Sequence, residues 1–198
     1  MPPAMSDRQA ILADAALMQA VSAGDHRAFE RLMRAESPRL VRLATSLLGS
    51  VAEAEEIAQE AFLRLWRTAP SWQPIARVGT WLHRVVYRLS IDRLRQRRPT
   101  VDVEDMESVL AGPDASPEEA LGARQREQSV EEALERLSPR QRSAILLAHV
   151  EGLSQMEAAS VLDVSEDAYE SLLARGRKRL RALVAESERG KDMDDDTR

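Results

Sequence analysis

The chain has 198 residues and a formal net charge of −5, with 43% hydrophobic but only 4% aromatic residues and few glycines or prolines. This composition favours an all-helical protein with one ordinary domain or two small ones. The chain has no cysteine, and its histidines His26, His83 and His149 have no second ligand at helical spacing, so disulfides are excluded and no metal or other cofactor is expected. The sequence has neither an apolar run near the roughly 20 residues of a membrane span nor a signal-peptide core, so we expect a cytoplasmic protein without membrane insertion.

Two helices are predicted before residue 50. The first surrounds LADAALMQAV and stops at Gly24. The second lies in DHRAFERLMRAESPRLVRLATSLLG, where Pro38 is expected to break or restart it and Gly49 to close it. Proline lacks a backbone donor, and glycine adopts the left-handed conformation that ends many helices.

A third helix, Val51–Arg67, is predicted to begin after the N-cap Ser50, because acidic residues in its first turn suit the helix dipole. Residues 68–79 contain two prolines and a glycine and are predicted to form a loop. Thr80 is predicted to cap a fourth helix that runs to about Arg98.

Charge lies in blocks along the chain. Residues 80–98 hold six arginines against one aspartate, a net of +5, whereas residues 99–128 hold eight acidic residues against two arginines, a net of −6. The last fifteen residues hold six acidic against three basic residues, a net of −3. Such blocks imply different partners for different segments. Because residues 99–128 also contain three prolines and show weak periodicity, we expect a flexible acidic linker there.

A second helical unit is predicted over residues 129–184. Its first helix carries proline in the first position and ends at Gly152. A short helix, QMEAASVL, a tight turn and a final helix then predict a helix-turn-helix. The polar residues 185–198 are expected to form a disordered acidic tail. The predicted N-caps of these three helices are Ser138, Ser154 and Ser165.

The helix predicted at 51–67 has an apolar face and an opposite acidic face, at about 100° per residue. An acidic face is commonly only solvated. Here Leu63 lies on it, with Phe62 and Trp66 nearby, and an apolar patch rimmed by carboxylates suits a partner helix that carries arginines. The predicted core face consists of Ala54, Ile57, Ala58, Ala61 and Leu65. The acidic face consists of Glu53, Glu56, Glu60, Leu63 and Arg67, with Gln59 beside it.

On the helix predicted at 80–98, arginines lie on one line about a third of a turn or more from the apolar stripe. Bases on a line bind a phosphate backbone, and aromatic rings among them stack on unpaired bases, which predicts a site for single-stranded DNA. The alternative is an exposed arginine-rich helix with packed tryptophans. Ile91 within the arginine line and Arg93 on the apolar stripe fit neither pattern. The basic line is Arg84, Arg88 and Arg95, bordered by Trp81 and preceded by Trp72, and the predicted core stripe is Leu82, Val85, Val86 and Leu89.

The final helix has an apolar stripe in which Gly176 allows a close approach by a neighbouring helix. The stripe is Tyr169, Leu172, Leu173, Gly176, Leu180 and Leu183. The outer face is Asp167, Ser171, Ala174 and Lys178, flanked by Glu170 and Arg175.

Together these segments resemble the extracytoplasmic-function (ECF) sigma factors of bacterial RNA polymerase, over about residues 13–98 and 129–184. The resemblance rests on SAGDHRAFERLMRAESPRLVRLATSLLGS, AEAEEIAQEAFLRLWR, GTWLHRVVYRLSIDRLRQRR and LERLSPRQRSAILLAHVEGLSQMEAASVLDVS, in that order. It implies an all-α protein of two small helical domains. The expected domains are a four-helix region 2-like domain at 1–98 and a region 4-like helix-turn-helix domain at 129–184, joined by the linker.

The resemblance also implies partners. The acidic face of the third helix would bind the coiled coil of the polymerase β′ subunit through Glu56, Gln59, Glu60 and, by geometry, Leu63. The loop and fourth helix would melt and read the −10 promoter element through Trp72, Trp81, Arg84, Arg88 and Arg95. The last helix would read the −35 element, while its domain rests on the β flap, through Ser165, Asp167, Glu170, Ser171, Arg175 and Lys178. The linker would thread the polymerase channels in place of RNA, and an anti-sigma factor would hold the protein inactive.

Two positions depart from the family pattern. Arg88 stands where the family commonly has asparagine, so the −10 readout is expected to differ. The family often has Thr-Val-Lys/Arg-Ser in the recognition helix, where this chain has Ala168, Tyr169, Glu170 and Ser171, so other −35 base contacts are expected.

Two rival functions remain open at this stage. A sigma-mimicking decoy or anti-anti-sigma module would bind protein only and would need no arginine-rich −10 helix. An ordinary helix-turn-helix repressor would leave the EEIAQEAF face and the acidic linker without a role. No enzyme is expected, since the sequence shows neither a nucleophile–base pair nor a phosphate loop.

Overall fold

The computed structural model describes residues 7–97 and 130–195, with side chains placed through residue 187. Every regular element within those ranges is helical, which confirms the all-α fold class. The chain forms two compact units, residues 1–93 and 94–198. The predicted acidic linker, 99–128, lies outside the described residues. None of the helices in the described part is both long and apolar enough to cross a membrane.

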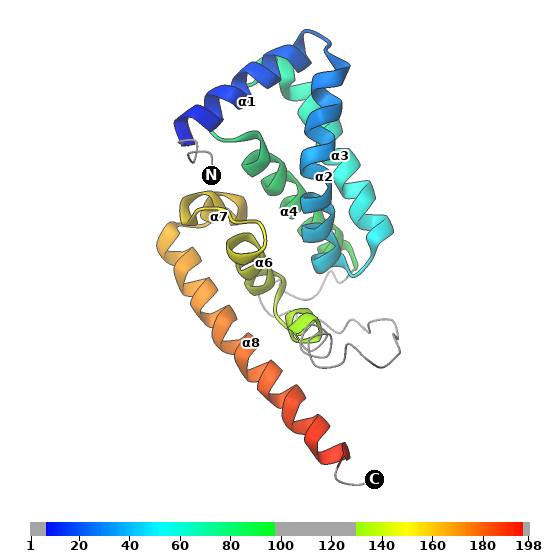
Figure 1. Ribbon diagram of the computed structural model, residues 1–198, viewed down its shortest axis with the longest axis vertical. Helices are drawn as coiled ribbons and strands as arrows, with labels where there is room; N and C mark the ends of the chain where they lie inside the picture. Colours follow the sequence, from blue (N-terminus) through cyan, green and yellow to red (C-terminus); the bar gives the residue numbers. More distant parts are fainter. Residues whose placement is uncertain (1–6, 98–129, 196–198) are drawn as a thin grey trace, which may run out of the picture. The chain divides into compact units, whose positions relative to one another are not determined.

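The first unit is built on a helical hairpin in which α2 and α3 pack along each other (Figure 1). The turn between them forms as predicted. Gly49 has a left-handed φ of 69° and donates to the carbonyl of Thr45, while the Ser50 hydroxyl accepts from the backbone N–H of Glu53. The predicted core face of α3 is buried in full, together with Phe62. The elements of this unit are α1 (Asp7–Ser22), α2 (His26–Leu48), α3 (Val51–Thr68), the 3₁₀ turn η1 (Ala69–Ser71) and α4 (Val78–Arg97), of which the residues after Arg93 belong to the second unit.

The predicted break at Pro38 is wrong, because α2 continues through it. An interior proline costs about 3 kcal/mol or more, mainly through a lost backbone hydrogen bond and a steric clash. Burial of each leucine on the same helix contributes about 1.5–3 kcal/mol in return. Leu32 before the proline and Leu40, Leu43 and Leu47 after it are all buried, so packing on both sides holds the helix together.

The fourth helix begins earlier than predicted and is not capped by Thr80. It starts at Val78, and Thr80 is buried within its first turn. The carboxylate of Asp14, on α1, accepts the backbone N–H of Val78 at 2.8 Å. A cap from a residue so distant in sequence leaves no local pattern, which is why the sequence suggested the nearest hydroxyl instead.

The buried face of α4 is also rotated from the predicted stripe. Beyond the first turn, its most buried positions are Leu82, His83, Val86 and Ser90, and Tyr87, Ile91 and Leu94 are also buried, whereas Val85 and Leu89 are only half-buried. This rotation explains the two misfits, because Ile91 is buried and Arg93 reaches α3 at the edge of the core.

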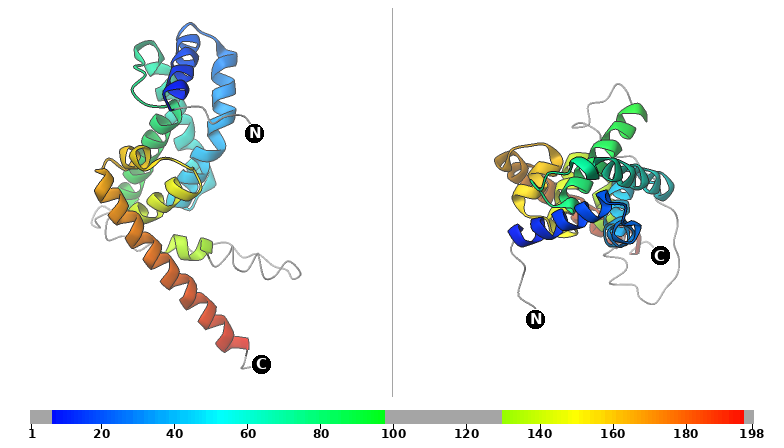
Figure 2. Two further views of the ribbon diagram at one scale, coloured as in Figure 1. Left: turned by 60° about the vertical axis from the view of Figure 1, so that its left-hand side comes forward. Right: turned by 90° about the horizontal axis from the view of Figure 1, so that it is seen from above.

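The second unit contains the predicted helix-turn-helix, formed by α7 and α8 (Figure 2). All three predicted serine caps accept a backbone N–H three residues on, and Ser154 forms a full capping box with Glu157. The first helix ends at His149, before Gly152, which adopts a φ of 61° in the following turn. The elements are a helical segment at 130–135, α6 (Pro139–His149), α7 (Gln155–Leu162) and α8 (Glu166–Asp195).

The last helix extends beyond its predicted end at 184, so the expected disordered tail is wrong for residues 185–195. Leu183 is fully buried in the core of the unit and Val184 packs beside it. Glu186 then pairs with Arg136 at 3.4 Å. These contacts hold α8 to the rest of the unit at the point where the sequence becomes uniformly polar.

The polar side chain of Arg142 is buried where α6 meets the preceding helical segment. Arg142 donates to the carbonyls of Glu135 and Leu137, which lie at and just after the end of the 130–135 segment. Burial lowers the pKa of Arg142 to about 10, opposed by the nearby charge of Glu135, so the guanidinium stays charged at neutral pH. Gly176 permits the close approach expected of it, because a Cβ there would lie 3.3 Å from the carbonyl oxygen of Gln141.

Tyr169 anchors the start of α8 to α6, and its hydroxyl donates to the carbonyl of Ala144 at 3.0 Å. Replacing Tyr169 with phenylalanine is expected to lower the stability of this unit by about 1 kcal/mol, because a buried carbonyl loses its donor. Burial raises the pKa of Tyr169, opposed by Arg177. The unfolded tyrosine therefore ionises first, and stability falls as pH rises through the ordinary tyrosine pKa near 10.

Hydrogen exchange of the α8 amides in the full chain measures both the stability lost with the tyrosine hydroxyl and the dependence of stability on pH. The phenylalanine variant should start less protected at pH 7 and should lose less protection as the pH rises towards about 10.5. Equal protection of the two proteins at pH 7 would show that this hydrogen bond contributes nothing.

Candidate polymerase and nucleic-acid interfaces

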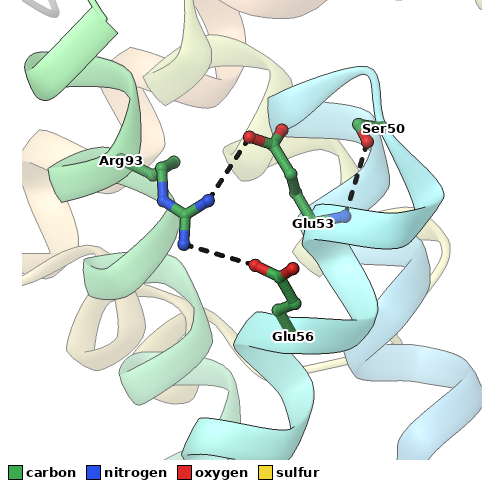
Figure 3. A network of polar contacts seen from close by, with 4 residues as sticks. All are labelled: Ser50, Glu53, Glu56 and Arg93. Carbon is green, nitrogen blue, oxygen red and sulfur yellow. Dashed lines mark hydrogen bonds and ion pairs between the residues drawn. The ribbon is translucent and has the colours of Figure 1, made fainter.

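The acidic face of α3 points to solvent, as expected, and is partly ordered by α4. Arg93 of α4 lies 3.3 Å from the Glu53 carboxylate and 3.6 Å from that of Glu56 (Figure 3). Ser50 caps the same turn of α3 by accepting the N–H of Glu53. Ion pairs that are this exposed contribute little to stability, about 0–1 kcal/mol. Their effect is to hold two carboxylates on one side of the helix.

Further along α3 the surface becomes apolar. The side chain of Leu63 is 51% exposed, and Gln59 beside it is also exposed. Glu60 forms an ion pair with Arg64 at 2.7 Å. The four residues predicted to contact the polymerase therefore lie together on one face, with Glu56 and Glu60 already engaged by arginines of this chain.

A second site lies where the end of α3 meets α4. There a groove of about 490 Å³ is lined by residues of both helices. Four of its seven lining residues are arginines, and the half-buried ring of Trp81 forms another part of the wall. Cationic side chains around an aromatic ring suit a single nucleic-acid strand, because the arginines attract phosphate and the ring stacks on a base. The lining residues are Arg64, Arg67, Thr68, Trp81, Arg84, Val85 and Arg88.

Some of the residues predicted to bind the −10 element line the groove, together with residues that were not predicted. Trp81, Arg84 and Arg88 line it, whereas Arg95 lies about two turns further along α4 and does not. Trp72 is not one of the lining residues, but its ring makes a T-shaped contact with the ring of Trp81, at 5.9 Å between centroids. The sequence did not point to Arg64 and Arg67, because they belong to α3 and only the packing of α3 on α4 brings them in.

The third surface is the outer face of α8. Ser165 caps the helix by accepting the N–H of Ala168 at 3.2 Å. All the other predicted −35 residues are exposed on the helix, with acidic groups in its first two turns and basic groups after them. Gln155, at the start of α7, lies 3.5 Å from the carbonyl of Glu166, so the first turns of the two helices meet. The remaining predicted residues are Asp167, Glu170, Ser171, Arg175 and Lys178.

The histidines have structural contacts of their own. His26 stacks on Trp66 at 5.4 Å, and His83 is buried with its Nδ1 2.8 Å from the carbonyl of Gly79. His149 accepts a hydrogen bond from Arg177. No group of three or more His, Asp or Glu residues that could hold a metal ion occurs within the described ranges.

Comparison with known proteins agrees with these features. Residues 32–100 match the family model for Sigma-70 region 2, and residues 127–180 match that for Sigma-70, region 4. The chain is 36% identical over 173 residues to the ECF RNA polymerase sigma factor SigM of Mycobacterium tuberculosis, covering 86% of this chain and 84% of SigM.

Two solved structures are also similar. CnrH, in complex with the cytosolic domain of CnrY, has a TM-score of 0.66 and 26% identity, over 87% of this chain and 97% of CnrH. The sigma factor RpoE of Bartonella quintana, in complex with the anti-sigma factor NepR, has a TM-score of 0.61 and 26% identity, over 79% of this chain and 96% of RpoE.

The helical fold and the two matching regions define a sigma-70 family protein. Within that family the chain belongs to the ECF sigma factors. It functions in transcription initiation with RNA polymerase, which the resemblance of its sequence predicted.

Proposed function

We propose a division of labour among the three surfaces of this sigma factor. The acidic face of α3 would bind the β′ coiled coil of core polymerase. The groove between α3 and α4 would hold the single-stranded −10 element after melting, and the outer face of α8 would read the −35 duplex. The protein would act in the cytoplasm, where polymerase and promoter DNA are found, and would catalyse no reaction itself.

The groove is the observation that carries this proposal. A protein that only mimics a sigma factor to capture another protein needs no arginine-lined groove beside an aromatic ring. A single DNA strand binds such a groove through its phosphates and bases. The groove therefore favours a DNA-binding sigma factor over a decoy.

Arg88 and Arg95 offer a matched test, since both are exposed arginines on one face of α4 and only Arg88 lines the groove. Replacing Arg88 with alanine in the holoenzyme should reduce open-complex formation about tenfold or more, the value of a charge-assisted hydrogen bond. Arg95→Ala should have a smaller effect, because its site lies outside the groove. Permanganate reactivity of unpaired thymines measures opening. An equal loss in both variants would mean that α4 attracts DNA only through its overall charge.

The exposed acidic residues of α8 suggest how the −35 element is selected. A carboxylate in the major groove accepts a hydrogen bond from cytosine N4 and fits the other base edges less well. Glu170 and Asp167 are exposed on the outer face of α8, where we propose the base contacts, so we expect cytosine on one strand of the −35 element. Arg175 and Lys178, one or two turns on, would hold the phosphate backbone and offset the repulsion from the carboxylates.

Regulation by an anti-sigma factor is the remaining part of the proposal. Two solved ECF relatives are complexes, CnrH with the cytosolic domain of CnrY and RpoE with the anti-sigma factor NepR. We expect a comparable protein to hold this chain away from core polymerase until it is released.

A further inference from the structure

Carboxylates from two other helices lie at the first turn of α4, and one of them bonds it directly. Asp14 of α1 accepts the N–H of Val78 at 2.8 Å. Glu36 of α2 packs against Gly79, where an added Cβ would lie 3.3 Å and 3.4 Å from its carboxylate oxygens. Carboxylates are favoured at a helix N-terminus, because the free N–H groups and the helix dipole both attract negative charge. The start of α4 is therefore fixed by tertiary contacts.

Helix α1 reaches both ends of the segment that leads into α4. At one end it packs against η1, whose Ala69 is buried. At the other end Asp14 binds Val78. Residues 72–77 lie between these points and include Trp72 and Ile75, the latter 80% exposed. Since the ends of this segment are tied to one helix, α1 determines where the segment can lie.

The groove begins one turn beyond this anchor. Trp81 follows Val78 by three residues and lines the groove, and Trp72 supports its ring from within the anchored segment. In the same turn His83, almost fully buried, contacts the carbonyl of Gly79 at 2.8 Å. A shift of the first turn of α4 would thus move Trp81 and displace Trp72 from its edge-on contact.

We propose that Asp14 is a positioning residue for promoter melting. It touches no DNA in this scheme. By holding Val78 it sets the start of α4 and so the place of Trp81 in the groove. This inference rests on the proposed function of the groove as the −10 strand site.

The test uses the full chain, free and assembled with core polymerase, and a fluorescent oligothymidine of about a dozen nucleotides as the single-stranded probe. Asp14→Ala should weaken probe binding about tenfold, in the upper range of what loss of a helix cap costs, and leave core affinity unchanged. It should also change the near-ultraviolet circular dichroism of the Trp72–Trp81 pair. Asp14→Asn, whose amide oxygen still accepts a hydrogen bond, should restore most of both signals.

Two control variants separate positioning from stability and from charge. Val21→Ala removes a buried side chain of α1 without touching Val78, so it should lower the melting temperature yet keep probe affinity and the tryptophan signal. Glu30→Gln removes an exposed carboxylate of α2 and should change none of these readouts. Should Asp14→Ala prove insoluble, Asp14→Ser gives the same comparison, because its side chain is too short to reach Val78.

Three outcomes would overturn the inference. Wild-type probe binding by Asp14→Ala, or equally weakened binding by Val21→Ala, would mean that Asp14 serves stability alone. Arg84→Ala, measured in parallel, shows which claim has failed. If Arg84→Ala loses probe binding while Asp14→Ala binds normally, only the positioning role of Asp14 is rejected. If Arg84→Ala binds the probe normally, the groove is not the strand site, and the inference about Asp14 is rejected with it.

Discussion

Replacing Leu63 with arginine is expected to reduce the affinity for core polymerase about a hundredfold, which is the effect of losing a central interface residue and introducing a charge in its place. Leu63 is the exposed apolar residue on a face whose other members are Glu53, Glu56, Glu60 and Arg67, with Gln59 beside them. A partner helix that carries arginines would pair with the carboxylates and cover the leucine. An arginine at 63 would repel that partner and leave its apolar contact unfilled.

Leu12→Arg is the matched control, because Leu12 is a leucine of similar exposure, 59% against 51%, on α1 of the same unit. It should leave core affinity and helical content unchanged. Charge reversal at Glu60 is a poorer choice, since Glu60 pairs with Arg64 of the groove and its loss would disturb both sites. If the Leu63 and Leu12 variants bind core polymerase with equal affinity in a titration, the polymerase does not contact this face of α3.

Single-stranded DNA binding should separate the aromatic and basic parts of the groove. Trp81→Ala is expected to weaken binding by about 1–3 kcal/mol, the worth of one stacked base, without changing how binding depends on salt. Arg84→Ala should also weaken binding, and it should reduce the slope of log affinity against log salt by about 0.7, the value for one phosphate contact on a single strand.

The two variants need to be compared over a range of salt concentrations with the full chain. Anisotropy of a labelled single strand gives both affinity and slope. If Trp81→Ala changes the slope as Arg84→Ala does, or neither variant weakens binding, the groove does not hold the strand in the proposed way. Melting temperatures of both variants show whether either has lost its fold.

Features governed by neighbours in sequence were predicted well. The caps at Ser50, Ser138, Ser154 and Ser165 formed as expected, since an N-cap bonds a residue only three positions away. The core face of α3 was also correct, because helical periodicity fixes which residues share a face.

Features that depend on packing between helices were not predicted. The cap of α4 comes from Asp14, 64 residues before Val78, and the buried face of α4 differs from the stripe that its own apolar residues predict. The groove shows the same limit. Arg84 and Arg88 were predicted from their spacing on one helix, but Arg64 and Arg67 join them only through the packing of two helices.

We expect this chain to direct core polymerase to promoters and to open them through the groove. In vitro transcription by core polymerase with the purified chain over a library of genomic promoters, with every start site mapped, tests both steps. We predict start sites that depend on the chain and share one −10 and one −35 motif, with relaxed preference at one −35 base pair for Glu170→Gln. Binding to core polymerase without any new start site would show that the chain is a decoy and does not open promoters.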